Sequence, residues 1–171
     1  METIDSKNII IIGGAGFIGS HLCDLLASKN TVVSIDNYLS GYKNNHVPGV
    51  TYITGSSLDI GDLAEDFSPD MIFHLGEYSR VESSYDDYDF VIANNLHPFS
   101  AVLSYAKKTD AKLIYAGSST KFANYSNKER PSPYAWVKEK NTEHLINYSS
   151  WFGLEYAIVY FYNVYGGNEI A

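Results

Sequence analysis

Cysteine, net positive charge and long hydrophobic runs are all scarce in this sequence. A single cysteine among 171 residues, Cys23, excludes an internal disulfide, and no paired cysteine and histidine spacing suggests a zinc site. Twelve basic against twenty acidic residues give a net charge of -8, which disfavours nucleic acid or an anionic membrane as a partner. An anionic ligand would therefore need a local binding device.

The early apolar run Ile9–Ile12 is too short to cross a bilayer, and the charged residues before it are unlike a signal peptide. We therefore expect a cytoplasmic protein. A hydrophobic fraction of 45% and a charged fraction of 19% are typical of globular chains. Residues 1–171 are enough for a single domain with a substantial core.

Short runs rich in β-branched residues alternate with amphipathic segments, which predicts a parallel sheet covered by helices. The predicted strands are Asn8–Ile12, Val32–Ile35, Thr51–Thr54, Met71–Leu75, Lys112–Ala116 and Glu155–Tyr160. The predicted helices span about residues 16–28, 58–67, 83–107 and 134–151, and Pro98 should kink or divide the third. Loops at 38–49 and 121–132 should lie at strand ends. We expect an α/β fold, a doubly wound Rossmann sheet of about six strands with helices on both faces.

A glycine-rich turn joins the first predicted strand to the first helix. Gly13, Gly16 and Gly19 follow the pattern Gly-x-x-Gly-x-x-Gly, which allows a tight turn and close approach of a pyrophosphate to the backbone. The helix N-terminus would supply free N–H groups to the phosphates. Asp36, 17 positions after Gly19, could accept hydrogen bonds from ribose hydroxyls and would repel a 2′-phosphate, favouring NAD over NADP. The alternative is a structural turn with Asp36 capping the next loop.

These motifs resemble the extended short-chain dehydrogenase/reductase family, the NAD-dependent sugar-nucleotide epimerases and dehydratases. The resemblance continues in order along the chain, through Ile72–Gly76, Asn95, Tyr115–Thr120, Ser132–Lys138 and Tyr162–Gly166. Gly76 and Glu77 replace two alanines that follow the fourth strand in the family. Ser56 stands where the family usually has an aspartate that contacts adenine, and Tyr160 replaces a frequent arginine.

The resemblance implies an NAD site and a nucleotide-sugar site, with no metal. The residues implied to bind the cofactor are Gly13, Gly16, Phe17, Ile18, Gly19, Asp36, Asn37, Ser56, Leu75, Gly76, Asn95, Tyr134 and Lys138. The implied catalytic residues are Ser118, Tyr134 and Lys138, and those implied to bind substrate are Ser118, Ser119 and Asn163.

Tyr134 and Lys138 are four residues apart and should share one face of a helix. The ammonium of Lys138 would favour the phenolate of Tyr134, and by the resemblance it would also donate to the nicotinamide ribose. Ser118 would hydrogen-bond the substrate hydroxyl and help relay its proton. The alternatives are a strand-end cap for Ser118 and an exposed helix pair for Tyr134 and Lys138.

The residues around Ser118 favour one reaction of the family over the others. Dehydratases carry Asp-Glu where this chain has Ser119-Thr120, and reductases generally prefer NADPH, against which Asp36 argues. We therefore expect an epimerase, most simply of the UDP-hexose 4-epimerase type, with a UDP-uronic acid decarboxylase as the nearest alternative.

Family members continue beyond Gly166 into a region that completes the substrate pocket, whereas this sequence ends at Ala171. An NAD-binding module with little or partner-dependent turnover is therefore a further alternative. The family pairs the helices that correspond to residues 83–107 and 134–151 across a two-fold axis, so we expect a homodimer through them.

Overall fold

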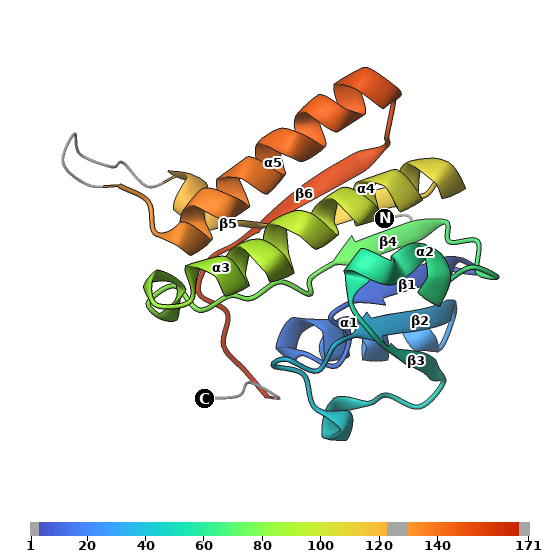
Figure 1. Cartoon of the computed structure of the whole chain (residues 1–171). Coiled ribbons are helices and arrows are strands. Elements are labelled where there is room, and N and C mark those ends of the chain that lie inside the picture. The colour runs from blue at the N-terminus through green and yellow to red at the C-terminus, as the bar shows by residue number, and fades with distance from the viewer. Residues whose placement is uncertain (1–3, 123–129, 168–171) are drawn as a thin grey trace.

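The computed structural model describes residues 4–122 and 130–167. The greater part of the predicted loop at 121–132 and the end of the chain at Ala171 lie outside these residues. Six parallel strands form one sheet in the order β3-β2-β1-β4-β5-β6 (Figure 1). The strands are β1 (Asn8–Ile12), β2 (Thr31–Asp36), β3 (Val50–Thr54), β4 (Met71–His74), β5 (Lys112–Ser118) and β6 (Tyr156–Phe161).

The predicted doubly wound α/β fold is confirmed, because the strand order reverses between the neighbours β1 and β4. All four residues Ile9–Ile12 are buried, as expected for a central strand covered on both faces. The predicted strand boundaries hold to within two residues at each end. Leu75, predicted in the fourth strand, lies just after it, where its amide donates to the Ile12 carbonyl at 3.0 Å and the chain turns at Gly76.

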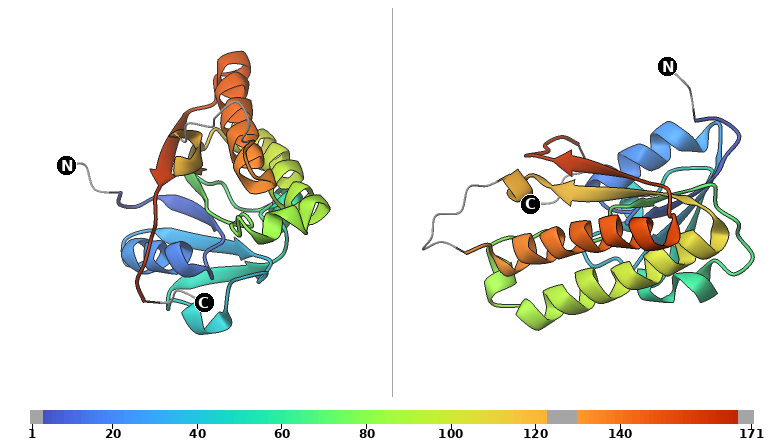
Figure 2. Two further views of the ribbon diagram at one scale, coloured as in Figure 1. Left: turned by 90° about the vertical axis from the view of Figure 1, so that its left-hand side faces the viewer. Right: turned by 90° about the horizontal axis from the view of Figure 1, so that it is seen from above.

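The helices cover the two faces of the sheet unequally. Helix α1 (Phe17–Ala27) lies on one face, and the helices α2 (Ile60–Leu63), α4 (His97–Thr109) and α5 (Pro133–Phe152) lie on the other (Figure 2). Short helical turns η1 (Lys43–Asn45), η2 (Ser57–Asp59), η3 (Ser83–Tyr85) and η5 (Ser119–Phe122) occur in the connections. Helices thus lie on both faces, but of the helices in the described residues only α1 covers its side of the sheet.

The predicted helix over residues 83–107 is interrupted, as Pro98 indicated. After η3 the chain forms α3 (Tyr88–Val91), a π-helical segment η4 (Ile92–Leu96) and then α4, with Pro98 in the first turn of α4. Proline has no N–H to donate, and its ring clashes with the carbonyl four residues earlier, so the wider π turn accommodates it.

The helix predicted over residues 58–67 is wrong in length, since α2 ends at Leu63. The hydroxyl of Tyr105 from α4 donates to the carbonyls of Ala64 at 3.0 Å and Phe67 at 2.8 Å. These carbonyls are fixed by a tertiary contact that the local sequence does not encode.

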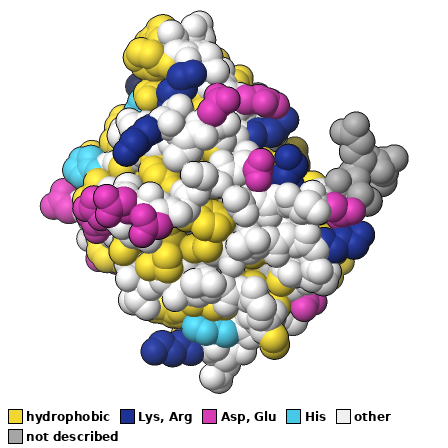
Figure 3. All heavy atoms as spheres, turned by 90° about the vertical axis from the view of Figure 1, so that its right-hand side faces the viewer, with side chains coloured by type: hydrophobic (Ala, Val, Ile, Leu, Met, Phe, Trp, Pro, Cys, Tyr) yellow, Lys and Arg dark blue, Asp and Glu magenta, His cyan; other side chains and the backbone are white. Residues whose placement is uncertain are grey.

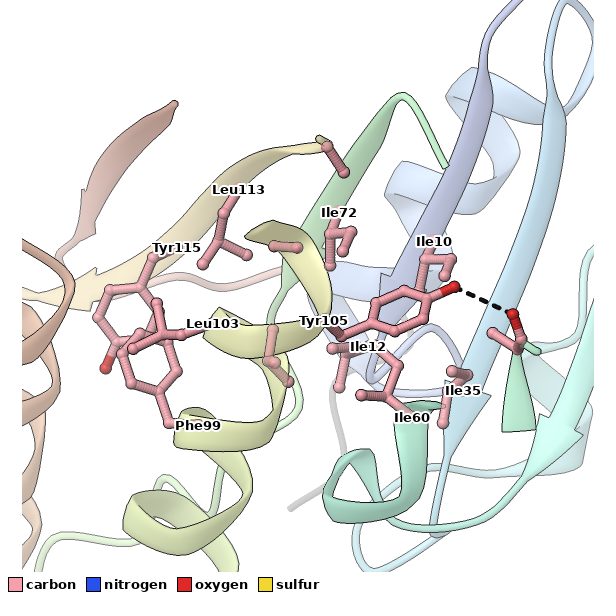
Figure 4. Packing of buried hydrophobic residues seen from close by; sticks show 14 of the residues in the cluster. Ile10, Ile12, Ile35, Ile60, Ile72, Phe99, Leu103, Tyr105, Leu113 and Tyr115 are labelled. Carbon is pink, nitrogen blue, oxygen red and sulfur yellow. Dashed lines mark hydrogen bonds between the residues drawn. The ribbon is translucent and has the colours of Figure 1, made fainter. Parts of the chain in front are cut away.

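The larger hydrophobic core lies between the sheet and the helices α2, α4 and α5. Isoleucines of the central strands meet Phe99 and Leu103 of α4 and Ile60 of α2, and Tyr105 reaches across them to Ala64 (Figure 4). A smaller cluster around Cys23 and Leu26 fixes α1 to the opposite face. The two clusters make the sheet a rigid support for the residues at its carboxyl edge.

Helices α4 and α5 end at the edge of the molecule opposite those carboxyl ends. Acidic, basic and hydrophobic side chains are interspersed on this face (Figure 3). Within the described parts of the chain, no helix is long and apolar enough to span a membrane.

Candidate active site

The candidate site lies at the carboxyl ends of β1, β4 and β5, where α1 and α5 begin. Gly13 follows β1, Leu75–Tyr78 follow β4, and Ser118 ends β5. In open parallel sheets this edge, at the point where the strand order reverses, is where ligands bind. The structure therefore gathers most of the predicted site residues at one edge.

The glycine-rich turn forms a closely packed cradle at the start of α1. Gly13 has a φ of +85°, and a Cβ there would lie 2.7 Å from the backbone of Gly76. A Cβ on Gly19 would overlap the carbonyl oxygen of Gly13. Only glycine fits both positions, which lets the turn after β1 pack directly against α1 and against the loop after β4.

The N-terminus of α1 is capped by Gly16, which has no side chain to accept a hydrogen bond. The first turn of any helix leaves its amides without acceptors inside the helix, and the helix dipole places a partial positive charge there. Phe17 and Ile18, both partly buried, begin this turn. The turn thus has the donors and partial charge that suit an anion, and binding of a pyrophosphate there stays a prediction.

Asp36 connects the cradle to the loop after β2. Its carboxylate is buried and accepts hydrogen bonds from the amide of Ala15 at 2.9 Å and from the amide of Tyr38 at 2.8 Å. Each carboxylate oxygen keeps a second lone pair for another donor. Asp36 thus fixes the cradle and can still accept a bond from a hydroxyl, so the structural and the ligand-binding interpretations are compatible.

Helix α5 carries the predicted Tyr134 and Lys138 on one buried stripe. Ser132 caps the helix by accepting from the amide of Ala135 at 3.2 Å, and Pro133 occupies the first turn. Tyr134 is 8% exposed and Lys138 is 6% exposed, so the interpretation as an exposed helix pair is wrong. The ammonium of Lys138 donates to the carbonyl of Ala116 on β5 at 2.6 Å.

The ammonium of Lys138 is also paired with a buried carboxylate. Glu77, in the loop after β4, places Oε2 2.6 Å from the Nζ of Lys138. Burial, the largest single influence, lowers the pKa of Lys138, but the charge and hydrogen bond of Glu77 together with Tyr115 and Tyr134 outweigh it and raise that pKa above its ordinary value. Lys138 therefore stays charged in a dry environment.

Three more side chains surround Glu77. Asn141 of α5 donates to Oε1 at 2.9 Å, the hydroxyl of Tyr115 donates to Oε2 at 3.3 Å, and the Nε2 of His74 lies 3.5 Å from Oε1. Burial lowers the pKa of His74 to about 4, opposed by Glu77 and reinforced by Lys138, so the imidazole is neutral near pH 7. We call His74, Glu77, Tyr115, Lys138 and Asn141 the polar cluster.

Of the polar cluster only Lys138 was predicted from the sequence, in which Glu77 is no more than a departure from the family pattern. Glu77 directly follows a buried strand and a glycine, where a charged residue signals a partner inside the protein. Asn141 lies three residues after Lys138 and shares its helix face. These two features are visible in the sequence, but neither shows that Glu77 and Asn141 contact each other.

Asn95, implied by the resemblance to bind the cofactor, contacts the loop after β4. Its side chain, on the π-helical segment, is buried and accepts from the amide of Tyr78 at 2.8 Å while donating to its carbonyl at 2.9 Å. Asn95 therefore fixes the loop that carries Gly76 and Glu77. A contact of Asn95 with the cofactor stays a prediction.

The remaining predicted residues lie around the same edge of the sheet. The hydroxyl of Ser118 accepts from that of Thr120 at 2.9 Å, and Ser119 begins η5. Ser56 caps η2 after β3, while Asn37 and Asn163 are exposed after β2 and β6. An apolar groove of about 380 Å³ lies beside α1, with Ile18, Leu75, Ala116 and Phe161 in its lining.

Among the described residues, no group of histidine, cysteine and acidic side chains could hold a metal ion. The site instead combines a backbone cradle, a buried carboxylate at Asp36 and a helix bearing Tyr134 and Lys138. The model of the NAD dependent epimerase/dehydratase family matches residues 9–170. The chain belongs to that family.

The family relatives span both reactions that the sequence left open. A Methanocaldococcus jannaschii protein with the provisional name UDP-glucose 4-epimerase is 32% identical over 94% of this chain and 57% of its own length. A UDP-N-acetyl-alpha-D-glucosaminuronate decarboxylase of Bacillus cytotoxicus is 32% identical over 66% of this chain and 37% of its own length.

Solved structures of epimerases have the same fold. The UDP-N-acetylglucosamine 4-epimerase of Methanobrevibacter ruminantium, solved with UDP-N-acetylmuramic acid, superposes with a TM-score of 0.87 at 28% identity, over 96% of this chain and 57% of that one. The UDP-glucose 4-epimerase of Thermus thermophilus, solved with NAD, gives 0.86 at 28% identity, over 95% and 57%. This epimerase-family chain thus spans little more than half the length of such relatives.

Proposed function

We propose that this chain is the NAD-binding and catalytic part of a nucleotide-sugar epimerase of the UDP-hexose 4-epimerase type. The observation that carries the proposal is the meeting of the glycine cradle and the Lys138 ammonium at the carboxyl edge of one sheet. The start of α1 suits the pyrophosphate of a dinucleotide. The buried Lys138 and the Tyr134 of α5 suit its nicotinamide end, next to a sugar hydroxyl that has to lose its proton.

The residues present fit NAD. The cradle at Gly13 and Gly19 leaves no room for side chains, so a pyrophosphate could approach the backbone at the start of α1. Asp36 could accept from the adenosine ribose and would disfavour a 2′-phosphate. Lys138 would donate to the nicotinamide ribose. Bound NAD would supply a hydride acceptor and donor for a carbon of the sugar ring.

The chain's own residues would move the proton. Tyr134 would take the proton of the sugar hydroxyl as hydride leaves the same carbon, and would return it when hydride comes back to the other face. Ser118 would hold that hydroxyl, and Ser119 and Asn163 would contact the substrate. The buried positions of Tyr134 and Lys138 keep both groups away from bulk water.

A decarboxylase acting on a UDP-uronic acid is the second candidate, favoured by the Bacillus cytotoxicus relative. It would use the same Tyr134 and Lys138 to form a keto-sugar. An NAD-binding module with little turnover is the third, because the relatives extend well beyond the part that this chain matches.

Calorimetry with NAD, followed by turnover assays, separates these candidates. The assays use a panel of UDP-, GDP- and dTDP-sugars and include UDP-glucuronic acid with detection of released carbon dioxide. Conversion of UDP-glucose to UDP-galactose supports the epimerase, and carbon dioxide release supports the decarboxylase. NAD binding without turnover supports the binding module, and the absence of NAD binding contradicts all three.

A homodimer is part of the same proposal. Tyr85, Tyr88 and Trp136 are exposed by 64%, 50% and 37%, and they line a groove of about 670 Å³ between the segments predicted to pair. Aromatic side chains are typical of protein interfaces. Sedimentation should give a dimer at micromolar concentration, and a monomer throughout would contradict it. The cytoplasmic location stays a prediction that cell fractionation would test.

A further inference from the structure

Glu77 stands between the two halves of the candidate site. The loop that carries Glu77 packs against the cradle through the contact of Gly76 with Gly13. Two hydrogen bonds between Tyr78 and Asn95 attach the same loop to η4. On the other side its carboxylate reaches α5 at Lys138 and Asn141. The residues on either side of Glu77 are thus held by contacts that do not involve the Glu77 side chain.

The carboxylate of Glu77 is almost completely removed from water. Its side chain is 3% exposed, and those of Lys138 and His74 are 7% and 1% exposed. A charge in such a place is costly unless a partner and hydrogen bonds compensate it. Glu77 has one cation, two hydrogen-bond donors from Asn141 and Tyr115, and the neutral imidazole of His74 beside it.

The position of the Lys138 ammonium follows from these contacts. Its long side chain could adopt many rotamers, yet Nζ is fixed between Glu77 Oε2 and the Ala116 carbonyl, each at 2.6 Å, and lies 4.7 Å from the centre of the Tyr115 ring. An ammonium has three donors, and the contacts with Glu77 and Ala116 use two of them. The ammonium lies at the carboxyl ends of β4 and β5, beside which the proposed nicotinamide ribose would lie.

We propose that Glu77 is a positioning residue that fixes the ammonium of Lys138 for the nicotinamide half of the cofactor. The inference rests on the proposed function, because it needs NAD to occupy the site. Glu77 acts through Lys138 alone. The titratable and charged groups that face it are His74 of β4, Tyr115 of β5 and Lys138 of α5.

Calorimetry with NAD and with ADP tests the inference, since ADP has the adenosine and pyrophosphate but lacks the nicotinamide ribose. Glu77→Gln should weaken NAD binding by about tenfold, within the range of measured couplings between contacting residues. Binding of ADP should change by less than about twofold, because the cradle does not use Lys138. Equal losses for NAD and ADP would mean that Glu77 only supports the fold, which overturns the inference.

A double-mutant cycle with Lys138→Met tests whether Glu77 acts through Lys138. The double variant Glu77→Gln/Lys138→Met should bind NAD no more weakly than Lys138→Met does. It also leaves no buried charge without a partner, so it should fold. Additive losses of NAD affinity would show an independent role of Glu77 and would overturn the inference.

A shorter carboxylate provides the second variant in case Glu77→Gln does not fold. Glu77→Asp keeps the charge but cannot reach Lys138 and Asn141 at once, so NAD binding should fall by about threefold with ADP binding unchanged. Unchanged NAD binding by both variants would overturn the inference and leave the proposed function intact. Absence of NAD binding by the unmodified chain would overturn both.

Discussion

The two helices that begin at the candidate site, α1 and α5, are built in opposite ways. Helix α1 starts at Gly16 without a side-chain cap, and its surroundings are backbone and glycine. Helix α5 starts at Ser132, whose hydroxyl accepts from the first turn, and its chemistry lies in the side chains of Tyr134 and Lys138. The first leaves backbone donors for an anion, whereas the second satisfies its backbone and presents titratable groups.

This difference divides the site into two kinds of binding surface. Around α1 the backbone packs so closely that tolerance to substitution is limited by space. Around α5 the polar cluster is buried, so its tolerance to substitution is limited by charge and hydrogen bonding. Substitutions that add volume, remove a charge or remove a helix cap should therefore have different effects on stability and ligand binding near α1 and near α5.

The largest effect should come from adding a methyl group to the cradle. Gly13→Ala should lower the free energy of unfolding by about 4 kcal/mol, from left-handed strain plus the clash with Gly76. Gly49→Ala is the matched control, since its φ of +86° is within one degree of that of Gly13 but nothing lies within 4 Å of the added Cβ. It should cost about 1 kcal/mol. Urea denaturation measures both, and equal losses would contradict the importance of the close approach.

Acid should destabilise the α5 side through His74. The folded-state pKa of about 4 lies below the ordinary 6.5, so the unfolded chain binds the proton first and stability is lost as the pH falls from 6.5 towards 4. The loss attributable to His74 should be about 3 kcal/mol. His74→Gln should have a shallower dependence of unfolding free energy on pH in this window. Parallel curves for the two proteins would show that His74 is not the group responsible.

On the α1 side, the preference for NAD over NADP should depend on the charge of Asp36. Asp36→Asn should reduce the preference for NAD over NADP by about tenfold, because the 2′-phosphate no longer faces a carboxylate. Asp66→Asn is the control, as it removes an exposed acidic residue just before β4, at the amino end of the sheet. Its cofactor preference should equal that of the unmodified chain. Calorimetry with both cofactors measures the ratio, and an unchanged ratio in Asp36→Asn would refute the assignment.

The smallest effect should come from the cap of α5. Ser132→Ala removes the acceptor for the Ala135 amide and should lower the free energy of unfolding by about 1 kcal/mol. Binding of ADP should be unaffected, because ADP would contact only the α1 side. Thermal unfolding measures the loss. A loss of ADP affinity in this variant would show that the two sides are coupled.

The sequence was sufficient to predict the cradle but not the polar cluster, for a physical reason. The cradle depends on residues within a few positions of one another, so the spacing of Gly13, Gly16 and Gly19 is visible along the chain. The bond from Asn141 to Glu77 joins residues 64 positions apart, and only the pairing of β4 with β5 and the packing of α5 bring them together. The same holds for Asn95, whose partner is Tyr78 on a loop that periodicity does not reveal.

The π-helical segment before Pro98 sets the direction in which the side chains of α3 point relative to those of α4. Each residue of an α-helix advances the direction of its side chain by about 100°, so one wide turn offsets everything before it relative to everything after it. Val91 lies before the wide turn and Phe99 after it, and both are 0% exposed. Deleting one residue from Ile92–Leu96 would remove the wide turn and rotate α3 relative to α4 by about 100°. The aromatic residues Tyr88 and Phe90 would then face a new direction.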